Sequence, residues 1–501
     1  MDSATHIAAV SIPAFSHQAS IVELCKKLLL LHLHPNNLHV TIIFPTIHSP
    51  PPHEAAIANL LRAFPSSIDF VFLPPPNLQD LPSETLAGVQ IQISVPRSMP
   101  FLREKLMSLS LTSRLVCLIA DSFATEALAI GKELNLLCYV YEPSTVMVVS
   151  LSFHLPEIEE SSSSSATDEC RDLSEVIQLP GTRSEPRAPP TAWGLAVIFP
   201  PVGCVPFLAK DLPDHLPVQS TEAYKLFLQQ CKRHRLADGV LVNSFIEMEA
   251  GAIAALTGGG RRNHPPIHPV GPIVQTCSNH QTDHGTSSSK ILRWLDEQPR
   301  RSVLYVSLGS GGTLCEDQLH ELALGLKMSG HKFLWALIKP PSKSPSATFI
   351  INGTASKDDP LGFLRRGFLE RTNGQGLLVP KWVPQVQVLR HGAGFLSHCG
   401  WNSTLESVDH GVPMIAWLFF HDQKMNAVVL NNDLKVALRP EVGENGIVQK
   451  EEIAKVIKSV MGGDDEGRKI STRIKELQRV ANNALRECGS SMKTLSHLAL
   501  K

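Results

Sequence analysis

The stretch FLSHCGWNSTLES, residues 395–407, passes from apolar to polar character within a few positions. Phe395 and Leu396 suit the end of a buried strand, Gly400 suits a turn, and Asn402 or Ser403 can cap a helix. A helix start presents backbone N–H groups and the positive end of the helix dipole, which together attract an anion, most often a phosphate. The stretch therefore predicts a phosphate site at a strand-to-helix turn.

Strand and helix patterns alternate on both sides of this turn. In the first half, apolar β-branched runs predict strands, and runs with helical spacing predict helices between them. The expected strands are 6–13, 39–45, 68–74, 115–122, 137–143 and 239–245, and the expected helices are 20–32, 53–64, 125–135 and 221–236. In the second half, the expected strands are 302–309, 332–338, 376–383, 393–399 and 413–419. This alternation predicts an α/β protein with two doubly wound Rossmann-like domains that face each other across a cleft.

The chain has 501 residues, which is too long for a single hydrophobic core. Two punctuated stretches interrupt the pattern, a Ser- and Pro-rich one at 156–216, expected to be loop, and one rich in Gly, His, Pro and Ser at 257–289. We expect domains at 1–256 and 290–484, joined by a linker at 257–289. A helix at about 485–501 is expected to pack back on the first domain.

Composition excludes several classes of function. The net charge is −1, from 46 basic and 47 acidic residues, which gives no indication of nucleic acid or an anionic membrane surface as a partner. The ten cysteines form no CxxC pair and suggest free thiols in a reducing compartment. The first residues lack a signal-peptide pattern, and no apolar run approaches the roughly 18 residues of a membrane span. We therefore expect a cytoplasmic protein, without an integral membrane segment, that acts as a monomer.

Aromatic and polar side chains at the strand ends of the second half suit a nucleoside. Trp382 ends a strand, where its indole can stack on a flat base. Gln385 is close enough in sequence to pair with the edge of that base. Glu406 lies one turn into the helix after Gly400 and can accept hydrogen bonds from two ribose hydroxyls.

The remaining candidates suit a diphosphate and a sugar. His398, Asn402 and Ser403, together with the helix start, can bind the diphosphate. Two polar residues follow the next strand and can bind sugar hydroxyls, and a turn of small residues closes the other side. The further donor-binding candidates are Ser307, Gly309, Ser310, Val383, Gly400, Trp401, Asp422 and Gln423. Together these residues predict a nucleotide-sugar site.

The segment WVPQVQVLRHGAGFLSHCGWNSTLESVDHGVPMIAWLFFHDQ, residues 382–423, resembles the signature box of plant secondary-product UDP-glycosyltransferases. The similarity covers most of the chain. The segments RSMPFLREKL, VLVNSFIEMEAGAI, HPVGPIV and LDEQPRRSVLYVSLGS resemble the branch that glucosylates hydroquinone, monolignols and related phenols. The resemblance implies the GT-B fold, with the acceptor on the first domain and the donor on the second.

The resemblance also implies a role for each donor residue. Trp382 would stack on uracil and Glu406 would bind the ribose, while His398, Asn402 and Ser403 would bind the diphosphate. Asp422 and Gln423 would hold the sugar, and glutamine at the latter position is usual for UDP-glucose. The implied co-substrates are UDP-glucose and a small hydroquinone-, monolignol- or flavonoid-like phenol. No DxD motif follows a strand, so neither a metal nor another cofactor is expected.

The resemblance places the catalytic pair at His17, after the first strand, and Asp121, after strand 115–120. A neutral imidazole can take the proton of an acceptor hydroxyl near pH 7, and the carboxylate would orient it. A single displacement would invert the anomeric configuration. The competing interpretations are a surface histidine at 17 and a helix cap at Asp121 for 123–135. His398 and Cys399 could suggest a metal, but no second ligand pair has suitable spacing.

The chain departs from the family pattern in four places. Ser16 and Ser20 replace the usual Gly before the catalytic His and the usual Pro three residues after it. The box is two residues shorter than usual between His391 and Phe395, and Ile338 stands where relatives commonly have Arg. Residues 181–202 form a Pro-rich insertion, expected to be a loop near the acceptor side.

Two classes of function remain open. The first is an inverting, metal-independent O-glucosyltransferase acting on small phenols, which the survival of His17, Asp121 and the donor box favours. The second is a nucleotide-sugar-binding protein with little catalysis, disabled by the insertion or by the changes beside His17. A C- or N-glucosyltransferase would use the same donor chemistry on another nucleophile.

Overall fold

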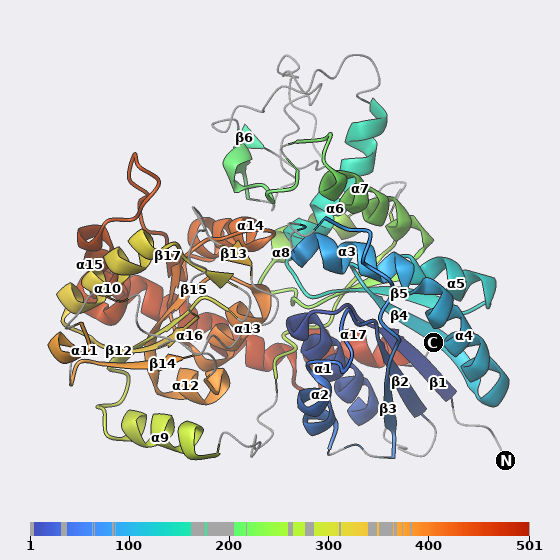
Figure 1. Cartoon of the computed structure of the whole chain (residues 1–501), viewed down its shortest axis with the longest axis horizontal. Helices are drawn as coiled ribbons and strands as arrows, with labels where there is room; N and C mark the ends of the chain where they lie inside the picture. The colour runs from blue at the N-terminus through green and yellow to red at the C-terminus, as the bar shows by residue number, and fades with distance from the viewer. Residues whose placement is uncertain are drawn as a thin grey trace. The chain divides into compact units, whose positions relative to one another are not determined.

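The chain forms two compact units, Met1–Ser278 with Asn483–Lys501, and Asn279–Asn482 (Figure 1). The structure is a computed structural model. It describes residues 5–31, 38–62, 64, 66–82, 85, 87–161, 176–177, 205–216, 218–258, 264–275, 285–309, 312–338, 348–349, 364, 368–372, 374–380 and 383–499. Ser310, Trp382 and the insertion at 181–202 lie outside these residues.

The first unit is built on a parallel sheet with the strand order β3-β2-β1-β4-β5-β8-β9. From β1 the chain adds strands outward on one side and then, beginning with β4, on the other side. The topological switch point therefore lies between β1 and β4, where ligands of such sheets bind. The strands are Thr5–Val10 (β1), Leu38–Phe44 (β2), Ile68–Phe72 (β3), Arg114–Asp121 (β4), Leu137–Glu142 (β5), Gly239–Val242 (β8) and Ile267–Pro269 (β9).

The second unit repeats this plan. Its sheet has the order β14-β12-β10-β15-β16-β17, again all parallel, and its switch point lies between β10 and β15. The strands are Val303–Ser307 (β10), Lys332–Leu337 (β12), Gly376–Pro380 (β14), Gly392–Ser397 (β15), Met414–Ala416 (β16) and Ala437–Leu438 (β17). Two short antiparallel pairs stand apart, Val176–Ile177 (β6) with Phe207–Leu208 (β7) and Gly312–Thr313 (β11) with Thr348–Phe349 (β13).

Helices bury apolar stripes within each unit. In α7, Tyr224, Phe227, Leu228 and Cys231 recur with helical spacing and are buried, and Thr221 caps the helix by accepting from the Tyr224 N–H. The helices of the first unit are Phe15–Leu31 (α1), Glu54–Leu61 (α2), Ala87–Arg97 (α3), Met99–Thr112 (α4), Ala127–Glu133 (α5), Val146–Ser161 (α6), Glu222–Arg233 (α7), Ala250–Thr257 (α8) and Ser490–Ala499 (α17). The α-helices that begin in the second unit are Gly285–Asp296 (α9), Glu316–Ser329 (α10), Phe368–Arg371 (α11), Gln385–His391 (α12), Trp401–His410 (α13), Gln423–Val428 (α14), Lys450–Lys458 (α15) and Asp465–Ala484 (α16).

The structure differs from the sequence-based expectations at several points. Helix α6 continues through Pro156 to Ser161, so the stretch expected to be loop begins later than predicted. Helices α3 and α4 occupy 87–112, which the pattern did not assign. Strand β9 lies within 257–289, expected to be linker, because Ile267 and Pro269 are buried where they extend the sheet beside β8.

Helix α17 belongs to the first unit although it follows the second in sequence. Leu495 lies in the same buried cluster as the apolar face of α1, and Figure 1 shows the two helices side by side. The Ser491 hydroxyl donates a hydrogen bond to the Gly271 carbonyl, and the Ser490 hydroxyl donates one to the Glu247 carboxylate at 2.9 Å. Apolar burial and these two bonds hold the end of the chain on the first unit.

Candidate active site

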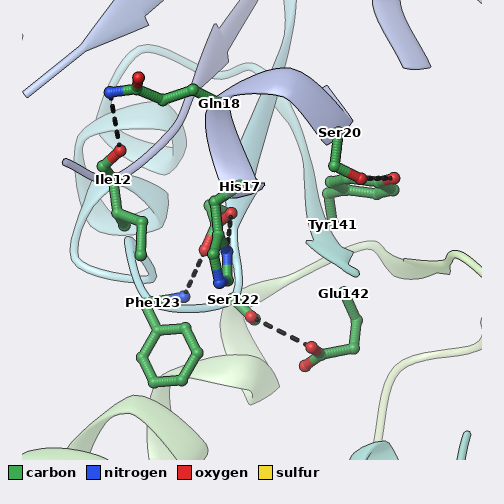
Figure 2. Close-up of polar contacts among 9 residues, drawn as sticks. Ile12, His17, Gln18, Ser20, Ser122, Phe123, Tyr141 and Glu142 are labelled. Atoms are coloured by element: carbon green, nitrogen blue, oxygen red, sulfur yellow. Dashed lines mark hydrogen bonds and ion pairs between the residues drawn. The ribbon is translucent and has the colours of Figure 1, made fainter. Parts of the chain in front are cut away.

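His17 and Asp121 meet at the switch point of the first sheet. His17 lies in the first turn of α1, directly after β1, and Asp121 is the last residue of β4, the strand beside β1. The His17 Nδ1 atom lies 2.8 Å from Asp121 Oδ2. Figure 2 shows His17 among its neighbours, with dashed lines for the polar contacts. The aspartate is fully buried, whereas the histidine side chain keeps 22% of its surface exposed. The buried carboxylate therefore holds an imidazole that is partly exposed to solvent.

The surroundings of Asp121 fix its orientation. Its Oδ1 accepts the Phe123 N–H at 3.0 Å, and its carbonyl accepts the Ala124 N–H at 2.7 Å. This is a local side-chain turn and not a helix cap, because α5 begins at Ala127 with Glu126 at the N-cap position. The interpretation of Asp121 as a cap for 123–135 is therefore wrong.

The geometry sets the tautomer of the imidazole. An ionised carboxylate only accepts hydrogen bonds, so Nδ1 of His17 carries the proton when it bonds Asp121. The lone pair then lies on Nε2. The Phe123 ring stands edge-on to the imidazole, with centroids 5.7 Å apart. A neutral histidine held this way can accept a proton at Nε2, as in a catalytic triad.

In the second unit, two glycines surround His398 at the switch point between β10 and β15. Gly309 has a φ of +81°, and a Cβ there would lie 2.6 Å from the His398 Nε2 atom. A Cβ at Gly400 would lie 2.4 Å from the same atom. Both positions must be glycine for the imidazole to occupy this place.

Among the described residues, His398 is a buried, neutral imidazole whose Nδ1 atom makes no hydrogen bond. Burial lowers the pKa of this histidine to about 4, and the nearby Asp422 carboxylate only partly opposes that change. Within the part of the chain that the structure describes, Nδ1 of His398 is buried and has no hydrogen-bond partner. Helix α13 starts three residues later with Gly400 at its N-cap, which has no side chain to bond the first N–H groups. These features fit an anion at the start of α13.

A hydrogen-bonded network joins helices α12 and α13 to strand β10 beside this turn. The Gln385 amide donates to Ser403 Oγ at 2.9 Å and to Glu406 Oε2 at 2.7 Å. The Tyr305 hydroxyl in β10 donates to Gln385 Oε1 at 3.2 Å. The network brings Gln385 against Glu406, the residue expected to bind ribose, although only the base edge was predicted for Gln385.

The residues expected at the sugar follow β16. Asp422 is the N-cap residue of α14 and Gln423 is its first residue. Asn426 connects Asp422 to the turn after β15, since its amide donates to Asp422 Oδ2 and to the Cys399 carbonyl, each at 3.1 Å. Cys399 and His421 both have positive φ values, 62° and 56°, which L-residues seldom adopt. Strain of this kind is often retained where a turn must present functional groups.

The structure brings most of the predicted donor residues to the ends of β10 and β15 and to α12–α14. Ser307 ends β10 and is buried, and Trp401 and Val383 are also buried, with 3% and 2% exposure. These two side chains therefore belong to the core, and only their backbone can reach a ligand. Ser310 and Trp382 lie outside the described residues.

Sequence reasoning missed Tyr305 and Asn426. Both are conspicuous only through their contacts, because one lies inside an apolar strand and the other inside a helix. Among the described residues, no cluster of three or more His, Cys, Asp or Glu side chains could hold a metal ion. Of the helices that the structure describes, none is both long enough and apolar enough to cross a bilayer.

Comparisons with known proteins show the family to which the chain is related. The family model described as UDP-glucoronosyl and UDP-glucosyl transferase matches residues 266–465. The chain is 41% identical over 503 residues to hydroquinone glucosyltransferase of Rauvolfia serpentina, covering 100% of this chain and 98% of that protein. It is 42% identical over 499 residues to UDP-glycosyltransferase 72B1 of Arabidopsis thaliana, covering 99% and 96%. The structure of Phytolacca americana UGT2 with UDP-2-fluoroglucose and pterostilbene superposes with a TM-score of 0.82 at 37% identity, covering 100% and 99%.

Two doubly wound parallel sheets, with these full-length similarities, define a glycosyltransferase of the GT-B fold, as the sequence predicted. The chain belongs to the plant UDP-glucosyl transferase family, in the branch of the hydroquinone glucosyltransferases. It is a UDP-glycosyltransferase.

Proposed function

We propose that the chain is an inverting, UDP-glucose-dependent O-glucosyltransferase of small phenols, with His17 as general base. The observation that carries this proposal is the His17–Asp121 contact of 2.8 Å at the switch point of the first sheet. The names of similar proteins support the acceptor class. One is a hydroquinone glucosyltransferase, and a solved relative is complexed with pterostilbene.

The base step follows from the tautomer of His17. The acceptor hydroxyl gives its proton to Nε2 while its oxygen bonds the anomeric carbon of glucose. The bond from that carbon to the diphosphate oxygen breaks, and UDP leaves with the electron pair. The imidazolium that forms is stabilised by the Asp121 carboxylate. Attack opposite to the leaving group converts the α-linked donor into a β-glucoside.

Different residues of the second unit bind the different parts of UDP-glucose. The diphosphate binds at the start of α13, where His398, Asn402 and Ser403 supply donors to the charge that develops on UDP. Glu406 and Gln385 bind the ribose, and Asp422 and Gln423 bind the glucose hydroxyls. Trp382 stacks on uracil, by the sequence pattern alone. We assign no metal ion to this reaction.

The test is transfer by the whole chain from UDP-glucose, UDP-galactose and UDP-glucuronate to hydroquinone, a monolignol and a flavonol, with EDTA in a parallel set. We expect UDP-glucose to be preferred and a β-O-glucoside to form with or without EDTA, identified by mass spectrometry and NMR. No basic side chain replaces Asp422 or Gln423 to pair with a glucuronate carboxylate. A preference for UDP-glucuronate contradicts the donor assignment.

The same assay separates the other functions. Binding of UDP-glucose without transfer to any acceptor would identify a nucleotide-sugar-binding protein. A product whose glucose is bonded to carbon or nitrogen would identify a C- or N-glucosyltransferase. Loss of transfer in EDTA, restored by a divalent cation, would contradict the absence of a metal from the reaction.

A further inference from the structure

Ser20 and Tyr141 share a hydrogen bond of 2.7 Å beside the His17–Asp121 pair (Figure 2). Ser20 lies in α1, and Tyr141 lies in β5, the strand between β4 and β8 in the sheet. Both residues are buried, at 4% and 0% exposure, so neither hydroxyl is open to a ligand. The bond is therefore internal to the first unit.

The Ser20–Tyr141 bond links α1 to the sheet in the same way as the His17–Asp121 bond does. Ser20 is three residues after His17, so the two side chains lie on the same side of α1, about one turn apart. Tyr141 is the register partner of Asp121 in the parallel pair of β4 and β5, so their side chains point to the same face of the sheet. Two hydrogen bonds thus join one face of α1 to two neighbouring strands, one at His17–Asp121 and one at Ser20–Tyr141.

The chemical setting keeps the second bond intact. Burial raises the pKa of Tyr141, and the opposing effect of the Ser20 hydrogen bond is smaller, so the phenol stays protonated at physiological pH. A buried hydroxyl that loses its partner cannot turn to water, so the bond resists opening. The family resemblance implies proline at the position where this chain has Ser20, and proline has no hydroxyl that could form this bond. The connection is therefore set by this chain's own residue.

We propose that the Ser20–Tyr141 hydrogen bond positions the base by holding the first turns of α1 in register with β4 and β5, so that His17 Nδ1 stays on Asp121. Tyr141 and Ser20 are positioning residues, because neither contacts a reacting atom. The proposal rests on the function proposed for His17, and its test separates the two.

The test compares Tyr141→Phe, Ser20→Ala and the double variant with the wild-type chain. The control is Thr41→Val, because Thr41 Oγ1 and His6 Nε2 form another buried side-chain bond in the same sheet, at 2.8 Å, that does not involve α1. The measurements are kcat and KM for UDP-glucose and hydroquinone. In addition, proton NMR follows the downfield resonance of the His17 Nδ1–H, assigned by its loss in His17→Ala.

We expect each single variant to lower kcat about 3- to 10-fold, the effect of one hydrogen bond, with little change in either KM. The double variant should be no worse than either single one, because all three lack the same bond. The His17 resonance should shift or broaden in these variants and stay unchanged in Thr41→Val. Ser20→Ala tests the same bond should Tyr141→Phe fail to fold.

Three outcomes decide the matter. An unchanged resonance with wild-type kcat in the Tyr141 and Ser20 variants overturns the proposal. Equal losses in Thr41→Val also overturn it, because they would show general destabilisation. A resonance that moves while kcat does not supports the positioning of His17 and rejects its role as the base.

Discussion

Replacement of Asp121 by asparagine tests the base directly. The carboxylate serves two donors, His17 Nδ1 at 2.8 Å and the Phe123 N–H at 3.0 Å. An amide offers a single acceptor oxygen, so one of these donors must face its NH₂ group. If the oxygen stays on the Phe123 N–H, the NH₂ group donates to Nδ1. The imidazole proton then moves to Nε2, and the base is lost.

The expected loss of turnover in Asp121→Asn follows from the free-energy cost of turning the asparagine amide the other way. Turning the amide restores the bond to His17 but leaves the Phe123 N–H against a second donor. An unsatisfied buried donor costs about 1–3 kcal/mol, so turnover in Asp121→Asn should fall about 5- to 150-fold. His17→Ala removes the proposed base and should lower turnover about 10²- to 10⁴-fold.

The assay is single-turnover transfer from UDP-glucose to hydroquinone, with UDP affinity measured by calorimetry. UDP affinity should change little, because the residues proposed to bind UDP lie in the second unit. Asp69→Asn is the matched control, since Asp69 also bonds a histidine, His39, at 2.9 Å, in strands β3 and β2. Wild-type turnover in Asp121→Asn would refute the role of the carboxylate, and an equal loss in Asp69→Asn would show that the effect is not local.

Two further predictions concern the second unit and the response to pH. Gly309→Ala places a methyl group 2.6 Å from His398 at a φ of +81°, so it should weaken UDP binding about tenfold or more by calorimetry. Gly330→Ala, at a φ of +74° with open space around it, meets the same backbone strain and should leave UDP affinity unchanged; equal weakening in both would contradict the clash with His398. Burial lowers the pKa values of His6, His234 and His398 to about 4. Their imidazoles take up protons on unfolding between pH 4 and the ordinary pKa near 6.5, so their contribution to stability is present above pH 6.5 and is lost as the pH falls towards 4. By pH 5 the loss should reach about 2 kcal/mol per histidine, visible as a lower Tm by differential scanning fluorimetry, and a constant Tm from pH 7.5 to 5 would contradict it.

The sequence by itself determined the fold class and supplied most of the residues proposed for the donor site. Parallel strands buried on both faces read as continuous apolar runs, and β1, β4, β10 and β15 lie close to where those runs predicted them. Most of the candidate donor residues lie in one segment, from Val383 to Gln423. Within it, the turn from β15 to α13 is enough to place His398, Ser403 and Glu406 at one end of the sheet.

Local pattern could not supply the segments whose structure depends on a neighbour. Strand β9 has three residues and is recognisable only through its pairing with β8. Helices α3 and α4 include the apolar residues Val95 and Leu102, which the pattern did not group because Pro96 interrupts the run. Their assignment required the surface on which they pack.

The resemblance paired His17 with Asp121, but the physical reason that such distant side chains meet lies only in the tertiary structure. His17 and Asp121 are 104 residues apart, and Ser20 and Tyr141 are 121 apart. Strand order and register bring these pairs together, and no local propensity encodes either. The Tyr305–Gln385 bond spans 80 residues for the same reason. The residue type sets a side chain's hydrogen-bonding capacity, but its partner depends on the tertiary structure. The tautomer of His17, for example, follows from the alignment of β1 with β4, which brings Asp121 to Nδ1.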